Sequence, residues 1–347
     1  MKSNYKRLGQ YIRQVDVRNT EGKEENLLGV SVQKRFIPSI ANTVGTDFTK
    51  YKVVKKGQFT YIPDTSRRGD KIGIALLEDY DEGLVSNVYT VFEVIDEKQL
   101  ISQYLMLWFS RPEFDRFARF KSHGSAREVM DWDEMCNVEL PVPTYEEQLE
   151  IVNSYKTIVE RIDLKQKIND NLEEQVYALY KQLTQSHDPN TVFESIATVQ
   201  SGKRHVSNEI GTYPLVGAGG IMSYINDYNF DEQILITGRV GTHGVIQRFF
   251  SKCWASDNTL VIKSDYYEFS YHFLKSVGWD LLNRGSTQPL VTQTDIKNLP
   301  LYLPDISELT AFEATAEKIM KHQRVLLKEI ESLNQLKDMI ITSLSKH

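Results

Sequence analysis

The sequence predicts an α+β protein in which two globular α/β regions are separated by two long helices that form a coiled coil. Two observations support this fold class. The chain repeats itself with an offset of 161 residues, and each copy ends in about 40 residues that contain neither glycine nor proline. A length of 347 residues is also what roughly two domains of ordinary size require.

The repeat is clearest where residues 124–143 align without a gap with residues 285–304. Five of these 20 positions are identical, and five more are apolar in both copies. The identical residues of the first copy are Gly124, Ser125, Asn137, Leu140 and Pro143. An internal repeat of this kind predicts two folding units with the same architecture.

The globular part of each copy contains short runs of β-branched and aromatic residues between turn residues, which predict strands. These runs are 53–54, 59–61, 72–75 and 88–92 in the first copy, and 233–236, 244–246 and 259–262 in the second. A short amphipathic helix is expected near 99–110 and another near 267–277. We therefore expect globular domains at 1–143 and 187–304, and long helices at 144–186 and 305–347.

The two long segments keep their seam positions at alternating spacings of four and three residues. This 3.5-residue period is typical of a coiled coil, and about 40 residues at 1.5 Å each give a helix of about 60 Å. Two ordinary amphipathic surface helices fit less well, because helices in globular proteins average about 11–12 residues. The apolar seam residues are Ile151, Ile158, Ile162, Leu172 and Leu179 in the first helix, and Phe312, Ile319, Leu326, Leu333 and Ile340 in the second.

The composition excludes several classes of protein. Two cysteines, Cys136 and Cys253, are too few for a disulfide framework or a thiolate zinc cluster. No apolar run approaches the ~18 residues of a membrane span, and the first residues do not resemble a signal peptide, so we expect a cytoplasmic protein without membrane contact. The net charge of −6 excludes a histone-like polycation but not DNA binding through local basic patches.

A search for catalytic motifs leads to the prediction of no catalytic residue and no metal site. The sequence has no Walker loop, no Asn-Pro-Pro-Tyr or Asp-Pro-Pro-Tyr motif of an adenine methyltransferase, and no histidine pair at metal-ligand spacing. Asp64, Asp96 and Lys98 match a permissive nuclease pattern, which leaves a self-contained metal-dependent endonuclease as one alternative. A coiled-coil scaffold whose globular ends bind other proteins is a second alternative.

Basic and polar residues cluster in the predicted loops of both copies, where they are candidates for DNA contacts. Arginine and lysine bind phosphates or guanine, and glutamine can bind adenine. A single exposed charge is more often only solvated, but the clusters occupy matching places in the two copies. The candidates are Arg67, Arg68, Lys71, Lys121, Ser125 and Arg127 in the first copy, and Lys203, Arg204, His205, Arg239, Thr242, His243, Arg284, Ser286, Thr287 and Gln288 in the second.

Several segments resemble the specificity subunit of type I restriction–modification systems. They are the repeat endings 140–143 and 301–304, and the second-copy segments 199–204, 213–221, 239–244 and 285–289. The resemblance covers essentially the whole chain, and it depends on the order of the segments and on the duplication rather than on any single motif. The first copy departs from the pattern, because it lacks a clear Gly-Ala-Gly-Gly stretch.

This resemblance implies a non-catalytic subunit of a phage-defence system, with one target-recognition domain for each half-site of a bipartite, asymmetric sequence in double-stranded DNA. The subunit would recruit two methyltransferase subunits, which use S-adenosylmethionine to methylate adenine N6, and ATP-dependent restriction subunits that also need Mg. This chain itself would hold no cofactor. Half-site centres about 34 Å apart would place both domains on one face of the duplex.

The resemblance further implies that the two long helices pack antiparallel. Four of their seam positions are polar, namely Lys165, Asn169, Gln323 and Lys337. Polar groups in a coiled-coil seam lower stability but select one register and orientation. Antiparallel packing is therefore expected to bring Asn169 and Gln323 together near the middle of the pair.

Overall fold

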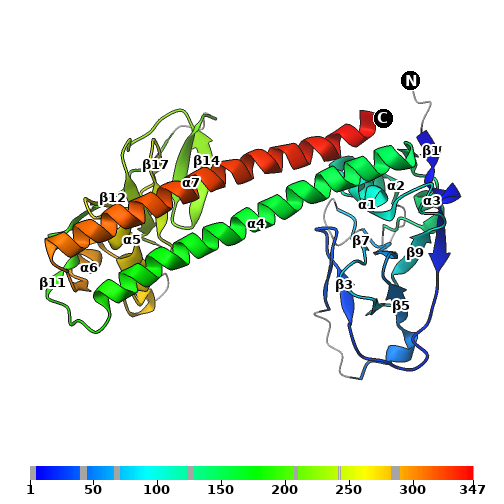
Figure 1. The fold of residues 1–347 in the computed structure, drawn as a ribbon, viewed down its shortest axis with the longest axis horizontal. Coiled ribbons are helices and arrows are strands. Elements are labelled where there is room, and N and C mark those ends of the chain that lie inside the picture. The colour runs from blue at the N-terminus through cyan, green and yellow to red at the C-terminus, as the bar shows by residue number, and fades with distance from the viewer. Residues whose placement is uncertain are drawn as a thin grey trace. The chain divides into compact units, whose positions relative to one another are not determined.

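The computed structural model describes residues 5–39, 45–65, 71–122, 128–206, 210–240, 242, 244–282 and 290–346. The chain divides into two compact units: unit 1 is Met1–Leu164 with Ile330–His347, and unit 2 is Lys165–Glu329. Each unit consists of a globular region and one half of the helix pair formed by α4 (Tyr145–Thr184) and α7 (Ile306–Ser343) (Figure 1). The predicted fold class, two α/β regions joined by two long helices, is confirmed.

The ends of α4 follow from its sequence. Thr144 and Glu147 form a reciprocal cap, in which the Thr144 N–H donates to the Glu147 carboxylate at 2.9 Å and the Glu147 N–H donates to the Thr144 hydroxyl at 3.4 Å. The helix stops at Thr184, shortly before Ser186 in the left-handed region (φ 70°) and Pro189. Between these points no glycine or proline interrupts the hydrogen-bond ladder.

Within each unit, α4 and α7 run antiparallel. In unit 1 the first half of α4 packs on the last part of α7 through Ile158 and Ile162 against Ile330 and Leu333. In unit 2 the last part of α4 packs on the first part of α7, where the Tyr180 and Phe312 rings lie 6.4 Å apart. The ten apolar seam residues are buried or half-buried: Ile151, Ile158, Ile162, Leu333 and Ile340 in unit 1, and Leu172, Leu179, Phe312, Ile319 and Leu326 in unit 2.

The polar seam residues of unit 2 contact one another across the helix pair. The Gln323 side-chain amide donates to the backbone carbonyl oxygen of Asn169 at 3.3 Å, and the Asn169 side chain is buried. Lys165 forms an ion pair with Glu329 of the facing helix. In unit 1, Lys337 instead donates to Asn334 one turn earlier on its own helix, at 2.9 Å.

The globular region of unit 1 is built on a four-stranded sheet of order β2-β9-β6-β7, accompanied by the pairs β1-β10, β3-β4 and β5-β8. Its elements are β1 (Tyr5–Arg7), β2 (Ile12–Val15), β3 (Leu28–Val30), β4 (Phe36–Pro38), β5 (Lys52–Lys55), β6 (Phe59–Tyr61), β7 (Ile74–Leu76), β8 (Glu82–Val85), β9 (Thr90–Val94), α1 (Ser102–Phe109), α2 (Pro112–Lys121), α3 (Trp132–Cys136) and β10 (Glu139–Pro141).

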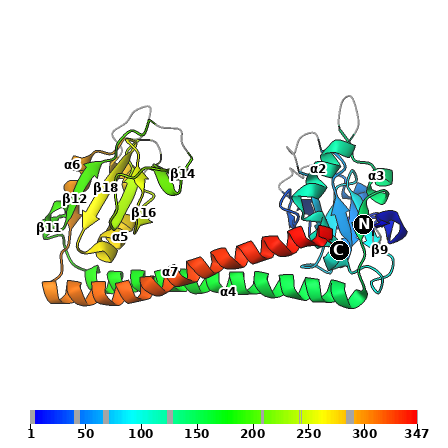
Figure 2. The same cartoon turned by 90° about the horizontal axis from the view of Figure 1, so that it is seen from above.

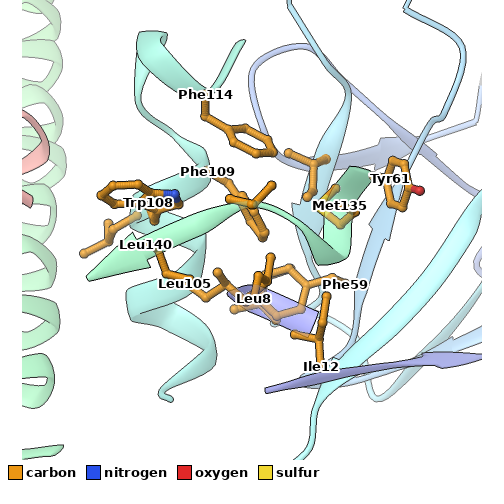
Figure 3. Packing of buried hydrophobic residues seen from close by; sticks show 14 of the residues in the cluster. Leu8, Ile12, Phe59, Tyr61, Leu105, Trp108, Phe109, Phe114, Met135 and Leu140 are labelled. Carbon is orange, nitrogen blue, oxygen red and sulfur yellow. The ribbon is translucent and has the colours of Figure 1, made fainter. Parts of the chain in front are cut away.

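The core of unit 1 lies between the four-stranded sheet and the short helices. Phe59 of β6 stacks on Phe92 of β9 at 4.8 Å, and Phe109 of α1 meets both rings edge-on. Figure 3 shows Phe59, Phe109 and Leu140 around Leu105 and Leu8. Leu344, just after α7, is fully buried in the same core, so the segment that follows α7 contributes to unit 1.

The globular region of unit 2 contains a four-stranded sheet of order β12-β18-β15-β16, a three-stranded sheet of order β14-β13-β17 and the pair β11-β19. Its elements are β11 (Thr191–Val192), β12 (Ala197–Ser201), β13 (Tyr213–Gly217), β14 (Gly220–Ile225), β15 (Ile234–Gly238), β16 (Gln247–Phe249), β17 (Trp254–Ala255), β18 (Thr259–Ser264), α5 (Tyr267–Ser276), α6 (Gln293–Lys297) and β19 (Pro300–Leu301). Helix α5 lies between the four-stranded sheet and the long helices (Figure 2).

The duplication is visible in the elements themselves. Helix α3 at 132–136 and helix α6 at 293–297 are separated by the 161-residue offset, and β10 and β19 correspond in the same way. One expected strand is wrong: residues 244–246 are not a strand, and β16 begins at Gln247. Gly244 has φ 80°, and a Cβ there would lie 2.9 Å from the Trp279 ring, so the backbone turns at this point before the strand begins.

Candidate nucleic-acid interface

In unit 2, the ends of strands β12 and β15 and the start of β18 lie at the same end of the four-stranded sheet. Because β12, β18 and β15 are antiparallel neighbours, the ends of β12 and β15 lie beside the start of β18. The Gly202 N–H donates to the Thr259 carbonyl at 3.1 Å, and the Arg239 N–H donates to the Asn258 carbonyl at 2.8 Å. The residues after β12 and after β15 are therefore attached to the same turn, Ser256–Thr259.

The Lys203–His205 segment is fixed by its backbone and exposes its basic side chains. The Lys203 N–H donates to the Ala255 carbonyl at 2.9 Å, and the Trp254 indole N–H donates to the Lys203 carbonyl at 2.8 Å. The His205 ring packs edge-on against Trp254 at 4.8 Å. Lys203 and Arg204 are exposed, as is Arg239 on the adjoining strand end. This arrangement presents cations from a rigid base, as phosphate or base contacts require.

Glycines allow the backbone segments at this end of the sheet to approach one another closely. A Cβ on Gly202 would overlap the Ser256 carbonyl oxygen. A Cβ on Gly238 would overlap the Thr242 carbonyl oxygen and lie 2.9 Å from the Ala218 Cβ. Ala218 is in the two-residue loop between β13 and β14, so this hairpin tip, Gly238 and Thr242 are in contact.

In unit 1, the two described candidates lie at helix α2. The Asp115 carboxylate of α2 accepts from the Ile72 N–H at 3.1 Å, which places the neighbouring Lys71 beside this helix with its side chain exposed. Lys121 ends α2 and forms an ion pair with Glu134 at 3.2 Å. This pair opposes a role of Lys121 as an independent phosphate contact, whereas the Lys71 side chain is exposed to solvent.

Nine of the sequence candidates lie outside the residues that the structure describes, and they remain predictions: Arg67, Arg68, Ser125, Arg127, His243, Arg284, Ser286, Thr287 and Gln288. Some residues that flank these segments are described, and their contacts show where the segments leave each unit. Thr65 and Ser122, which flank two of these segments, share a hydroxyl hydrogen bond of 2.9 Å in unit 1. In unit 2, Leu290 forms a β-bridge with Val240, next to Arg239.

A buried polar cluster in unit 2 was not anticipated from the sequence. Arg248 of β16 forms ion pairs with Glu268 of α5 at 2.8 Å and with Glu173 of α4 at 3.4 Å, and its guanidinium covers the Tyr271 ring at 3.4 Å. Lys275 adds a second cation, 3.3 Å from Glu173. The cluster therefore connects the edge strand β16 with helix α5 and the long helix α4.

Burial controls the charge of this cluster. Burial raises the pKa of Glu268 to about 7, against the lowering effect of Arg248. Burial also lowers the pKa of His272 to about 3, so this fully buried ring, which packs beside the Tyr177 and Tyr180 rings, is neutral at physiological pH. Both groups lie in the packed layer between α5 and α4, which indicates a structural role.

Helices α1 and α5 each begin next to a side-chain hydrogen-bond acceptor from a long helix. The Glu313 carboxylate of α7 accepts from the Phe269 N–H at 2.7 Å and from the Glu268 N–H at 3.2 Å, at the start of α5. In unit 1, the Gln148 side chain of α4 accepts from the Ile101 N–H at 2.8 Å, at the start of α1. These contacts satisfy helix N–H groups that have no partner within the helix. These contacts therefore attach each globular region to a long helix of its own unit, namely α4 in unit 1 and α7 in unit 2.

The residues of the nuclease pattern do not assemble into a site. In the antiparallel pair β6-β9, Tyr61 lies opposite Thr90, so Asp64 follows the end of β6 near the start of β9. Asp96 follows the other end of β9, about 17 Å away along this five-residue strand. There its carboxylate accepts from the Lys98 N–H at 2.9 Å as a turn residue. Over the described ranges, no cluster of three or more histidine, cysteine or acidic residues could hold a metal ion.

In the described part of the chain, no helix is both long enough and apolar enough to span a bilayer. The long helices α4 and α7 instead alternate buried seam positions with exposed charged ones.

The chain matches the family model of the type I restriction modification DNA specificity domain over residues 5–174 and 192–340. It therefore belongs to this family of DNA-recognition subunits. Like the family, it is a non-catalytic specificity subunit rather than an enzyme, and the family has no cofactor of its own. A search of curated proteins gave no significant match.

A solved structure with a TM-score above 0.5 shares this fold. The type I restriction–modification S subunit from M. genitalium has 15% sequence identity and a TM-score of 0.64, over 98% of this chain and 95% of that chain. A chain from a study of assembly and conformational transition of the type I R-M system has 16% identity and a TM-score of 0.47, over 98% and 96%. The HsdS subunit from Thermoanaerobacter tengcongensis has 15% identity and a TM-score of 0.39, over 98% and 96%.

Proposed function

We propose that the globular regions 1–143 and 187–304 are two target-recognition domains, each of which binds one half-site of a bipartite DNA sequence. The observation that supports this most directly is in unit 2, where exposed Lys203 and Arg239 follow two strand ends whose backbones bond to the turn Ser256–Thr259 or to Ala255 just before it. Because the two globular regions differ in sequence, the half-sites differ and the target is asymmetric.

The two cations have different roles in this proposal. Lys203, with a single ammonium group, contacts a phosphate and adds affinity for any sequence. Arg239 has a planar guanidinium that can bind guanine through two hydrogen bonds, so it contributes to the choice of sequence. Thr242, exposed beside Arg239, supplies a hydroxyl to the same surface.

The helices α4 and α7 set the gap between the half-sites in this proposal. Helix α4 has 40 residues, which is a length of about 60 Å. Its seam residues form apolar layers with α7 in both units, and such layers hold the two helices in one register. The gap is then a fixed number of base pairs.

Partner subunits would supply the chemistry. Two methyltransferase subunits with S-adenosylmethionine would modify adenine N6, and restriction subunits with ATP and Mg would translocate and cut. Because the substrate is the DNA of the cell, the complex works in the cytoplasm. A groove in unit 1 between α1 and α4, of about 700 Å³ and lined by polar residues as well as by exposed Leu149 and Val159, supports contact with a partner protein.

A domain exchange tests the proposal. Residues 190–304 are replaced by the same segment of a family member with a different target, and methylated motifs are sequenced in cells that also make the methyltransferase subunits. We expect one half-site to change while the other half-site and the gap stay the same. A change in both half-sites would overturn the assignment of one domain to each half-site.

A further inference from the structure

Strand β16 carries two neighbouring side chains with separate partners. Successive residues of a strand point to opposite faces, and here Arg248 points to α5 and α4 while Gln247 points to the β13–β14 hairpin. The Gln247 side-chain amide donates to the Gly217 carbonyl at 2.9 Å and lies 3.4 Å from the Ala218 carbonyl. It therefore connects the edge of the four-stranded sheet with the tip of a hairpin from the other sheet.

The hairpin tip has a backbone that only glycine accommodates well. Gly220 has φ 146°, and a Cβ on Gly217 would lie 2.7 Å from the Met222 sulfur. The tip also rests on Gly238, since a Cβ there would lie 2.9 Å from the Ala218 Cβ. A small displacement of the tip therefore changes the packing at Gly238, which precedes Arg239.

The hairpin needs support at its tip. Strand β14 is the edge of its three-stranded sheet, and most of its side chains are exposed, including Ile221, Met222 and Tyr224. A hairpin with little burial is marginally stable by itself. Gln247 is half-buried, so its two hydrogen bonds are partly shielded from competing water.

We infer that Gln247 is a positioning residue for sequence recognition by unit 2. Its amide fixes the hairpin tip against Gly238, and this contact fixes the backbone at Arg239 and at Thr242. Gln247 itself is not a DNA contact in this inference. The inference rests on the proposed function, because it requires that Arg239 and Thr242 face the second half-site.

The experiment uses the full chain and duplexes selected from a pool with randomised half-site positions. Gln247→Met keeps the length of the side chain and removes its donor. We expect it to reduce discrimination at one or two positions of the second half-site by about fivefold to a hundredfold, the range of one lost base contact. Discrimination in the first half-site, and affinity for random DNA, are expected to stay unchanged. The amides of residues 217–220 are expected to exchange hydrogen faster.

Gln233→Met is the matched control. Gln233 is exposed and precedes β15 at the opposite end of the same sheet, so the same chemical change there should alter no readout. Gln247→Lys keeps a donor within reach of the two carbonyls and should retain most of the discrimination. It also keeps the inference testable if Gln247→Met does not fold, because loss of discrimination in a folded Gln247→Lys protein would overturn it.

The outcomes separate this inference from the function on which it rests. If Arg239→Ala relaxes the second half-site and Gln247→Met does not, the positioning role is wrong and the proposed function stands. If Gln247→Met weakens binding to all sequences alike, its role is only structural and the inference is also wrong. If neither Arg239→Ala nor exchange of residues 190–304 changes the preferred sequence, the proposed function itself fails.

Discussion

Replacing Arg248 by methionine is predicted to destabilise unit 2 by about 3–5 kcal/mol at pH 8.5, because it removes the cation paired with the buried Glu268 carboxylate. The Glu268 side chain has only 2% of its surface exposed, and Arg248 lies 2.8 Å away. Glu173, 3.4 Å from Arg248, keeps Lys275 as a second partner at 3.3 Å. The largest part of the loss is therefore expected from Glu268.

The predicted loss depends on pH with a definite sign. Burial raises the pKa of Glu268 from 4.5 in the unfolded chain to about 7 in the folded protein. A carboxyl group with a raised pKa stabilises the fold when it is protonated, so its contribution is complete below about pH 4.5 and is lost as the pH rises through 7. A difference of this size corresponds to about 3 kcal/mol.

Removal of Arg248 raises the pKa of Glu268 further, because the guanidinium lowers it in the native protein. At pH 5.5 the variant can protonate Glu268, and the destabilisation should fall to about half of its value at pH 8.5 or less. Glu313, whose pKa burial also raises to about 7, and His272 titrate in both proteins. Comparison of variant and native chain at the same pH largely cancels their contributions.

The assay is urea unfolding at pH 5.5 and 8.5, with brief proteolysis and mass spectrometry to separate cleavage within 190–304 from cleavage within 5–143. The double variant Arg248→Met with Glu268→Gln should recover most of the stability, since the Glu268 charge is removed together with its cation and Glu173 keeps Lys275. Arg13→Met is the control: Arg13 is largely exposed in its 2.6 Å pair with Glu93, and the change should cost less than about 1 kcal/mol. An equal loss at both pH values, without recovery in the double variant, would refute the argument.

Further predictions concern DNA binding and the helix pair. Arg239→Ala should reduce discrimination at one or two base pairs by about 1–3 kcal/mol. Lys203→Ala should weaken binding to all DNA sequences alike and reduce the slope of log K against log salt by about one. Binding titrations at several salt concentrations measure both effects. Asn169→Leu should raise the urea midpoint of unit 2 by the equivalent of about 1 kcal/mol, because the buried Asn169 amide oxygen has no hydrogen-bond partner among the described residues; a lower midpoint would contradict this. Inserting seven residues into each long helix, beside Asn169 and Gln323, should lengthen the pair by about 10 Å and the methylated motif by about three gap base pairs, with unchanged half-sites; an unchanged gap would show that the helices do not set it.

The long helices were predictable because their signal is local and repeated. The expected ranges 144–186 and 305–347 differ from α4 and α7 by no more than a few residues at either end. Strand β6 was also predictable, since Phe59-Thr60-Tyr61 is a compact run of aromatic and β-branched residues. In both cases a few neighbouring residues contain the whole pattern.

Elements that depend on distant partners were not predictable. Strand β1 is polar and short, and it forms because residues 5–7 pair with residues 139–141. The Arg248 cluster combines residues from β16, α5 and α4, and no spacing in the sequence connects Glu173 with Glu268. For the proposed DNA contacts, the sequence indicated basic and polar loops, but it could not indicate that Lys121 would be paired with Glu134.

The division of the helices between the units has a consequence for synthesis of the chain. Unit 2 is contiguous, so every residue of its core has left the ribosome once Glu329 has emerged. Unit 1 begins earlier but needs Ile330, Leu333 and Leu344 to cover Ile162 and to fill the core around Leu8. Unit 1, which begins to emerge before unit 2, is thus completed after it, and until then it exposes an apolar surface that chaperones could bind.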